Sequence, residues 1–368
     1  MRKRSRITFS LLLVALVGGI AWLAFRPSEP RYKGRRLSAW LEDLNEARPG
    51  PQFDEAREAI SQMGSNSLPR IISMLRARDS LSKQRLMKWA GEHHMFESAF
   101  EPVQKSQHHA VIACFVLGPK AAPAIPALIA FLNEGNVGTG VGQTLAKMGP
   151  EALGPLIGSL SNRDDLVRRE VAYSLGDFQS NAPMVVPVLI QCLKDKASSV
   201  RFFAAVSLAH LAKEPTVAIP ALVGALNDED NTVRYTACLA IGEFRQQAQS
   251  ATAPLLTLLE DADPEIRVAA AMVLARIHPE DPSMVEKVLP FLIKDLEDKP
   301  DLNPQNGHYS RDFRPGVISV LAECGPLARP AEPALVKCLN DAESFIREAA
   351  AKALKAIDLE AAEKAGVK

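Results

Sequence analysis

Three stretches decide the fold of this chain: Val200–Leu208 (VRFFAAVSL), Val233–Ile241 (VRYTACLAI) and Ile266–Leu274 (IRVAAAMVL). Each carries an arginine at its second position, and these arginines follow one another every 33 residues. Apolar or small residues stand three, four, seven and ten positions after each arginine, which is the spacing of one face of an α-helix. The alanines at the first two of these positions are small enough to let a second helix approach closely. The pattern predicts a chain of packed helices.

The same unit recurs on both sides of these stretches. Arg168 stands one step before them, and Arg314 and Arg347 repeat the step after a longer interval. Upstream of the arginine helix lies a second apolar run, opened in most units by a proline, which a first helical turn tolerates because its missing N–H has no partner there. Each unit is therefore expected to be helix, tight turn, helix. Eight units are counted from the leucines that close the first helix: Leu75, Leu132, Leu160, Leu193, Leu226, Leu259, Leu296 and Leu339.

One helix pair cannot bury its apolar face alone, so the units are expected to stack. The sequence predicts an all-α fold, a right-handed α-solenoid of about eight helix pairs. Residues 37–119 are assigned to an N-terminal cap and divergent repeats, residues 120–358 to regular repeats, and residues 359–368 to a polar tail that caps the array. Trp40 is expected to anchor the packing of the first cap.

These units resemble the HEAT repeats, including the short bacterial variety named after phycobilisome lyases. The resemblance rests on the helix-opening prolines, the V/I-R-x-x-A-A-x-x-L core and the Asp-x5-Arg pairs. It implies a hydrogen-bonded ladder between successive repeats. Arg168 departs from the pattern because Asn162 stands where an aspartate is expected. The ladder residues implied by the resemblance are Asp195, Arg201, Asp228, Arg234, Asp261, Arg267, Asp341 and Arg347.

The N-terminus is expected to lie in a membrane. Residues 7–25 are 19 residues without a charge, which as a helix span about 28 Å, close to the hydrocarbon thickness of a bilayer. A basic leader (1–6) precedes them and a basic linker (26–36) follows. Because no A-x-A site ends the apolar run, we expect an uncleaved transmembrane signal anchor; a cleaved signal peptide, which would make a secreted binding protein, and a buried soluble helix are the alternatives.

Positive charges stand on both sides of the apolar segment, four before it and five from Arg26 to Arg36, so the charge rule nearly ties and the form of the leader decides the expected orientation. A basic leader ahead of an apolar run is the build of an export signal, so we expect a bacterial inner-membrane protein with a cytoplasmic N-terminus and an exported solenoid. Segments around Tyr32-Lys33-Gly34 and Leu37–Leu41 resemble those that precede membrane-anchored bacterial HEAT arrays.

Charge argues against nucleic acid as a ligand. The whole chain has 43 basic and 43 acidic residues, but residues 1–36 hold nine basic residues and one acidic residue. Residues 37–368 therefore carry 34 basic and 42 acidic residues, a net charge of −8. A surface of that sign repels phosphate backbones. The five cysteines lack CxxC spacing and are expected to be small buried hydrophobes.

Chemistry-bearing motifs are sparse. The sequence shows no nucleophile with a paired base, no glycine-rich phosphate loop and no metal quartet, so neither catalysis nor a cofactor is expected. The alternative is an enzyme of the bilin-lyase-like HEAT class, which rests on the resemblance alone. The possible metal ligands His93, His94, His108 and His109 are not expected to form a site, since adjacent histidines point to different sides of a helix.

Two surfaces are candidates for binding an unknown protein partner. The first is a strip one and five positions after the arginines, unless neighbouring repeats cover it: Tyr173, Phe202, Val206, Tyr235, Leu239, Val268 and Met272. The second is an insertion, residues 298–313, where the interval from Arg267 to Arg314 exceeds the period by 14 residues. It ends with His308, Tyr309, Arg311 and Phe313. The alternative to a binding protrusion is a solvated loop without a function. The expected function is a membrane-tethered scaffold for protein–protein interaction.

Overall fold

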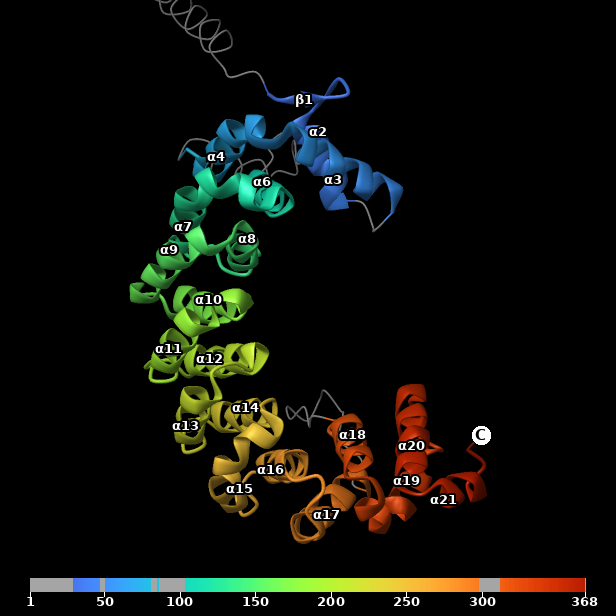
Figure 1. Cartoon of the computed structure of the whole chain (residues 1–368). Helices are drawn as coiled ribbons and strands as arrows, with labels where there is room; N and C mark the ends of the chain where they lie inside the picture. The colour runs from blue at the N-terminus through green and yellow to red at the C-terminus, as the bar shows by residue number, and fades with distance from the viewer. Residues whose placement is uncertain (1–28, 47–49, 81–84, 86–102, 298–311, 368) are drawn as a thin grey trace, which may run out of the picture. The chain divides into compact units, whose positions relative to one another are not determined.

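A computed structural model describes residues 29–46, 50–80, 85, 103–297 and 312–367 (Figure 1). The chain forms two compact units, residues 1–155 and 156–368. Residues 120–155 belong to the first unit because α7 (Ile125–Asn133) and α8 (Val141–Met148) pack on α4 (Leu68–Arg76) and α6 (Val103–Leu117).

The first unit opens with a β-hairpin. Strands β1 (Arg31–Tyr32) and β2 (Arg35–Arg36) pair antiparallel, with Arg31 opposite Arg36. The two loop residues, Lys33 and Gly34, have φ angles of 47° and 77°, as a type I′ turn requires. The expectation of a linker over residues 26–36 is thus wrong for residues 31–36, because these two positive φ angles turn the chain back on itself.

A helical hairpin follows, made of α2 (Leu37–Glu46) and α3 (Pro51–Met63). Trp40, on α2, is only 2% exposed, so it lies in the core of this first cap. The pairs α4 with α6 and α7 with α8 complete the unit. Its short 3₁₀ turns are η1 (Gly64–Ser67), η2 (Gly118–Ala124) and η3 (Pro150–Ala152).

The second unit is entered through α9 (Leu153–Gly158) and alternates two kinds of helix. We call the first helix of each pair A and the second B. B helices pack on the next B helix along the chain, so they form one layer, and the A helices form the other (Figure 1). The A helices are α9, α11 (Ala182–Cys192), α13 (Pro215–Ala225), α15 (Thr252–Leu258), α17 (Pro282–Glu297) and α19 (Glu332–Cys338); the B helices are α10 (Asp165–Leu175), α12 (Ser198–Leu211), α14 (Asn231–Gly242), α16 (Pro264–Ile277), α18 (Arg314–Cys324) and α20 (Ser344–Ile357).

The periodicity places the core correctly. Ala204, Ala205 and Leu208 on α12 are at most 1% exposed, and the same positions on α14 and α16 are buried. Aspartates cap three of the B helices: Asp164, Asp230 and Asp263 each accept a hydrogen bond from the N–H two residues on, at 2.9 Å. Apolar spacing and caps together explain why these segments are helices.

Several turns from a B helix to the next A helix use left-handed backbone. Gly118 and Gly325, each with φ of 55°, begin η2 and η8 (Gly325–Ala331). The equivalent first residue of η6 (Arg245–Ala251) is not glycine: Arg245 has φ of 51°, a conformation that side chains with a Cβ disfavour. The remaining 3₁₀ turns are η4 (Ser159–Ser161) and η5 (Gln179–Asn181).

The chain ends in a short helix. Residues 359–368, expected to be a polar capping tail, contain α21 (Leu359–Lys364), which packs on α20. Asp358 accepts a hydrogen bond from the Ala361 N–H at 3.1 Å, and Ala362 is fully buried. One side of α20 is therefore covered by α21.

Within the part of the chain that the structure describes, one helical segment has the length and apolar character of a membrane span, Val103–Asn133, with mean hydropathy 1.7 and half of its apolar window buried. Gly118, with its positive φ, divides this segment into α6 and α7, which belong to the array and pack on their neighbours. The expected anchor, residues 7–25, lies outside the described residues.

Candidate functional site

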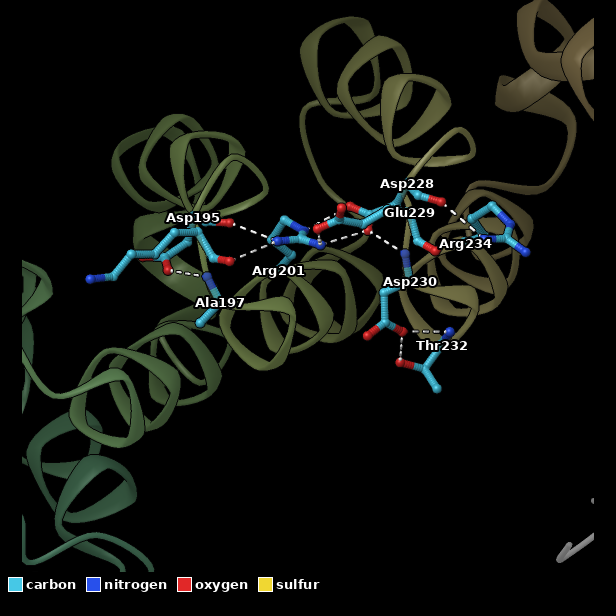
Figure 2. A network of polar contacts seen from close by, with 9 residues as sticks. Asp195, Ala197, Arg201, Asp228, Glu229, Asp230, Thr232 and Arg234 are labelled. Atoms are coloured by element: carbon cyan, nitrogen blue, oxygen red, sulfur yellow. Dashed lines mark hydrogen bonds and ion pairs between the residues drawn. The ribbon is translucent and has the colours of Figure 1, made fainter.

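A ladder of arginine–aspartate pairs joins the B helices on the side of the A-to-B turns (Figure 2). Arg168 donates from Nε and Nη2 to the two carboxylate oxygens of Asp195 at 2.8 and 2.9 Å. Arg201 does the same to Asp228, at 2.7 Å for both bonds. Two further pairs, Arg234 with Asp261 at 3.4 Å and Arg314 with Asp341, continue the ladder. Each pair connects one repeat to the next, 27 residues on.

Five ladder arginines also bind main-chain oxygens of their own turn, whereas Arg314 binds the Asp312 carboxylate at 2.8 Å through Nε and Nη2. Arg201 donates from Nη1 to the carbonyl oxygens of Asp195 and Lys196 at 2.9 and 3.3 Å. The Asp195 carboxylate in turn accepts the N–H of Ala197 at 2.9 Å. The Asp-x5-Arg pairs of the sequence are therefore main-chain contacts within a repeat. Four arginines have a carboxylate partner in the following repeat: Arg168, Arg201, Arg234 and Arg314.

Arg168, Arg267 and Arg347 differ from the other ladder arginines. Arg168 forms a complete pair although Asn162 precedes it, because only the main-chain oxygen of that residue is needed, at 3.0 Å from Nη1. Arg267 and Arg347 donate to the turn carbonyls of Asp261 and Asp341 at 2.6 and 2.7 Å. Asp298 follows the closing Leu296 as the ladder aspartates follow their leucines, but it lies outside the described residues.

In the first unit, two residues together make the contacts that a single ladder arginine makes elsewhere: one binds the turn carbonyls and the other forms the ion pair. Gln107 donates from Nε2 to the carbonyl oxygens of Leu75 and Ala77 at 3.3 and 3.0 Å. Arg78, from the turn itself, forms the ion pair with Glu134, which follows Leu132 as the ladder aspartates follow their leucines. Sequence spacing missed this arrangement, because a long insertion separates Leu75 from Gln107 and no arginine marks the position.

These ion pairs are largely buried, so the loss of one partner is expected to lower the free energy of unfolding. The side chains of Arg201 and Asp228 are 8% and 9% exposed, and those of Arg168 and Asp195 are 6% and 17% exposed. The hydrogen bonds from Arg168 hold the pKa of the Asp195 carboxyl below its usual range, and those from Arg314 do the same for Asp312. A carboxyl with a lowered pKa stabilises the folded state only while it is ionised.

We therefore expect the array to lose stability in acid. Lowered pKa values contribute stability that is fully present above the unfolded pKa, about 4 for aspartate, and is lost as the pH falls through the folded values. The free energy of unfolding should stay level between about pH 5 and 8 and fall below about pH 4. Denaturant titrations at a series of pH values measure it. In Asp195→Asn, stability at neutral pH should be lower and the acid slope shallower; an unchanged slope would show that the pair does not couple folding to protonation.

An aromatic cluster lies on the B layer at α10 and α12. Phe203 is at its centre, with its ring 5.4 Å from that of Tyr173 and 4.9 Å from that of Phe202, both edge to face. The Arg169 guanidinium lies 5.8 Å from the Phe203 ring. Leu166 and Tyr173 are each 42% exposed. We call this surface the α10–α12 patch: Leu166, Arg169, Tyr173, Phe202, Phe203 and Val206.

Part of this patch could have been found from the sequence. Leu166, Arg169 and Tyr173 are spaced three and four residues apart, and so share one face of α10. Phe203 was not expected because it follows Phe202 directly, but it is the ring that joins the two helices. Phe202 and Val206, from the expected strip, are half-buried.

The other half of the expected strip is occupied by the protein itself. The Tyr235 ring lies 5.9 Å from that of Phe313, the last residue of the insertion, so the two candidate surfaces meet. Met272 is only 8% exposed and packs at Gly316 of α18, whose missing Cβ makes room for the methionine methyl. Met272 is thus wrong as a partner-binding residue, since α18 covers it. Val268 and Leu239 are half-buried.

A second contact also involves α18. Arg245, after α14, forms an ion pair with Glu323 of α18 at 3.0 Å, which bridges two repeats. This ion pair and the Tyr235–Phe313 contact link α14 and the turn after it to α18, two repeats further along. The α10–α12 patch carries no such cover among the described residues.

Other predicted residues fall in different places. His308, Tyr309 and Arg311 of the insertion, and His93 and His94, lie outside the described residues. His108 is exposed, whereas His109 is 7% exposed, so the two side chains do point apart. No group of three possible metal ligands occurs among the residues that the structure describes. All five cysteines are buried, and burial raises the pKa of Cys114 and Cys192 to about 12.

Comparisons with known proteins agree with this architecture. Sequence profiles of HEAT repeats match residues 153–231 and 219–304, and a profile of a single HEAT repeat matches residues 333–358. The search of curated proteins produced no match. Kap121p aligns at 12% identity and a TM-score of 0.54 over 87% of this chain and 45% of that one. Kap121p bound to Pho4p aligns at 12% identity and 0.56 over 88% and 38%. An engineered protein aligns at 21% identity and 0.41 over 90% and 92%.

Helix pairs that stack in two layers, joined by buried ion pairs from repeat to repeat, define an α-solenoid. The profile matches identify its repeats: the second unit is built largely of HEAT repeats.

Proposed function

We propose that this protein is a membrane-tethered scaffold that binds another protein through the α10–α12 patch and catalyses no reaction. The patch itself carries the proposal. Tyrosine, phenylalanine and arginine are the residues enriched at the centres of protein interfaces, and here they are partly exposed on helices that buried ion pairs hold in place. The solved complex of Kap121p with Pho4p supports a binding role for an array of this fold.

The chemistry of the patch indicates what its partner presents. Leu166 and Tyr173 offer apolar contact on α10, and the Phe202 and Phe203 rings offer faces and edges on α12. Arg169 supplies a guanidinium that can pair with a carboxylate. A partner that places an apolar side chain between α10 and α12 and a carboxylate beside it would satisfy all of these groups.

The membrane half of the proposal rests on residues 7–25. Their uncharged apolar sequence matches the thickness of a bilayer, and the basic leader before them has the form of an export signal. We propose a single-pass anchor in a bacterial inner membrane, with the N-terminus in the cytoplasm and the solenoid on the exported side.

Photo-cross-linking in membranes tests the proposal. A photoreactive residue is introduced at Tyr173 in the full chain, and a matched one at Met184, which is 62% exposed on α11 in the A layer. The expected result is one discrete adduct from position 173, in the membrane fraction, and none from position 184. Equal labelling at both positions would show that the patch has no preferred partner.

The variants Leu166→Ser and Tyr173→Ser separate binding from folding. Both side chains are 42% exposed, so each replacement should change the free energy of unfolding by no more than about 1 kcal/mol. Each serine variant carries the photoreactive residue at the other of these two positions, 173 or 166. We expect the yield of its adduct to fall at least about tenfold. Met184→Ser should leave it unchanged. A full adduct from both patch variants would contradict the assignment.

A further inference from the structure

The β-hairpin Arg31–Arg36 is basic and exposed. Residues 29–36 carry four basic side chains against Glu29, a net charge of +3. Arg31 and Arg36 are exposed, and the side chains of Lys33 and Arg35 are 61% and 45% exposed. The charge stands in contrast to the net −8 of the residues that follow.

This hairpin is built onto the first cap. The Trp40 indole N–H donates to the Tyr32 carbonyl oxygen at 3.3 Å, and the Leu37 N–H donates to that of Pro30 at 2.9 Å. The Arg35 guanidinium lies 4.0 Å from the centre of the Trp40 ring, which is itself 2% exposed. These contacts hold the hairpin main chain and the Arg35 side chain in place against α2, which a linker would not do.

The hairpin follows the expected membrane segment closely in the chain, which indicates that it lies near the membrane surface. Only five residues separate Phe25, the end of the apolar segment, from Arg31. A chain of that length reaches at most about 17 Å when fully extended, so with residues 7–25 in a bilayer the hairpin lies within reach of its headgroups. Basic side chains are attracted to an anionic surface, and the attraction falls off over a Debye length of about 8 Å.

The neighbouring carboxylates do not cancel this charge. Lys33 pairs with Glu55 at 3.4 Å and Arg35 with Asp43 at 2.7 Å, but both carboxylates are substantially exposed, at 52% and 36%. Exposed ion pairs of this kind are weak and can exchange for phosphate. The acidic residues of α2 and α3 are repelled by an anionic surface, which favours the hairpin as the edge that faces it.

We propose that the hairpin Arg31–Arg36 binds anionic lipid headgroups and so fixes the base of the array against the membrane. The inference rests on the proposed anchor at residues 7–25. Arg31 and Arg36 are the side chains most available for headgroup phosphate, since the described contacts of Arg35 and Lys33 already engage those two.

Hydrogen exchange in bilayer discs tests the inference on the full chain. The amides of residues 31–37 are compared in discs of phosphatidylcholine alone and in discs rich in phosphatidylglycerol. We expect exchange roughly five- to tenfold slower in the anionic discs, and the difference should vanish in about 0.5 M salt. Arg31→Gln with Arg36→Gln should abolish the difference, whereas Arg163→Gln with Lys196→Gln, at turns of the second unit, should not.

Three outcomes would overturn it. Equal exchange in the two kinds of disc, with the protein incorporated, contradicts headgroup binding and leaves the anchor intact. Slower exchange on adding inorganic phosphate to phosphatidylcholine discs would assign the hairpin to a free anion instead. Failure of the chain to enter either disc removes the anchor and the inference together.

Discussion

Replacing Arg201 by alanine is expected to lower the free energy of unfolding of the second unit by about 3–5 kcal/mol. The guanidinium makes two bonds of 2.7 Å to Asp228 and two more to the turn carbonyls of residues 195 and 196. Both charged side chains are less than 10% exposed. Removal of the arginine leaves the Asp228 carboxylate buried without its counter-charge, and that loss, rather than the attraction itself, sets the size of the effect.

The matched control is Arg234→Ala. Its ion pair to Asp261 is longer, at 3.4 Å, and its side chain is 20% exposed, so the expected cost is about 1–2 kcal/mol. Because repeat arrays unfold in parts, native-state hydrogen exchange of the α12 and α14 amides is the appropriate measurement, beside thermal unfolding. Equal losses in the two variants, or a loss below about 1 kcal/mol for Arg201→Ala, would show that the ladder contributes no more than a surface ion pair.

Gly176→Ala is expected to destabilise the α10–α12 contact by about 2 kcal/mol. A Cβ on Gly176 would lie 2.9 Å from Ser207 Oγ, 3.1 Å from its Cβ and 3.2 Å from its Cα. The serine cannot turn away freely, because its hydroxyl donates to the Ala172 carbonyl oxygen at 2.8 Å. The strain is steric, since the φ of Gly176 is −60° and alanine adopts that conformation readily.

Gly158→Ala supplies the comparison. Its backbone is also right-handed helical, with φ of −56°, but a Cβ there meets nothing within 4 Å. Alanine should stabilise that position by a few tenths to about 1 kcal/mol. Thermal and denaturant unfolding of the two variants measure the difference. If Gly176→Ala proves as harmless as Gly158→Ala, then close approach of the B helices does not limit this position.

Much of the fold could be predicted from the sequence because it is periodic. Apolar spacing after Arg201, Arg234 and Arg267 places the buried face of each B helix, and prolines and capping aspartates place the helix starts. The hairpin at residues 31–36 was missed because two residues per strand leave no alternation to detect. Its only signal is the Lys33-Gly34 pair in the turn.

The candidate site was harder to predict because it depends on which repeats touch. The expected strip treated Tyr173, Tyr235 and Met272 alike, since all follow a ladder arginine by one or five positions. Their surroundings differ: Tyr173 is 42% exposed, Tyr235 lies against Phe313, and Met272 is covered at Gly316. The approach of α18 to α16 and to Tyr235 of α14 is not visible in a local pattern.

By itself the sequence determined the repeat, its helix pairs and its buried faces, because these follow from spacing within a few turns of helix. Tertiary structure decided the partners. Arg201 is six residues from Asp195 in the chain, yet its carboxylate partner is Asp228, 27 residues away in the next repeat. It also decided that Tyr173 of the α10–α12 patch is 42% exposed among the described residues, whereas Tyr235 lies against Phe313 and Met272 is buried. Contacts between repeats depend on curvature, which arises only when many units pack together.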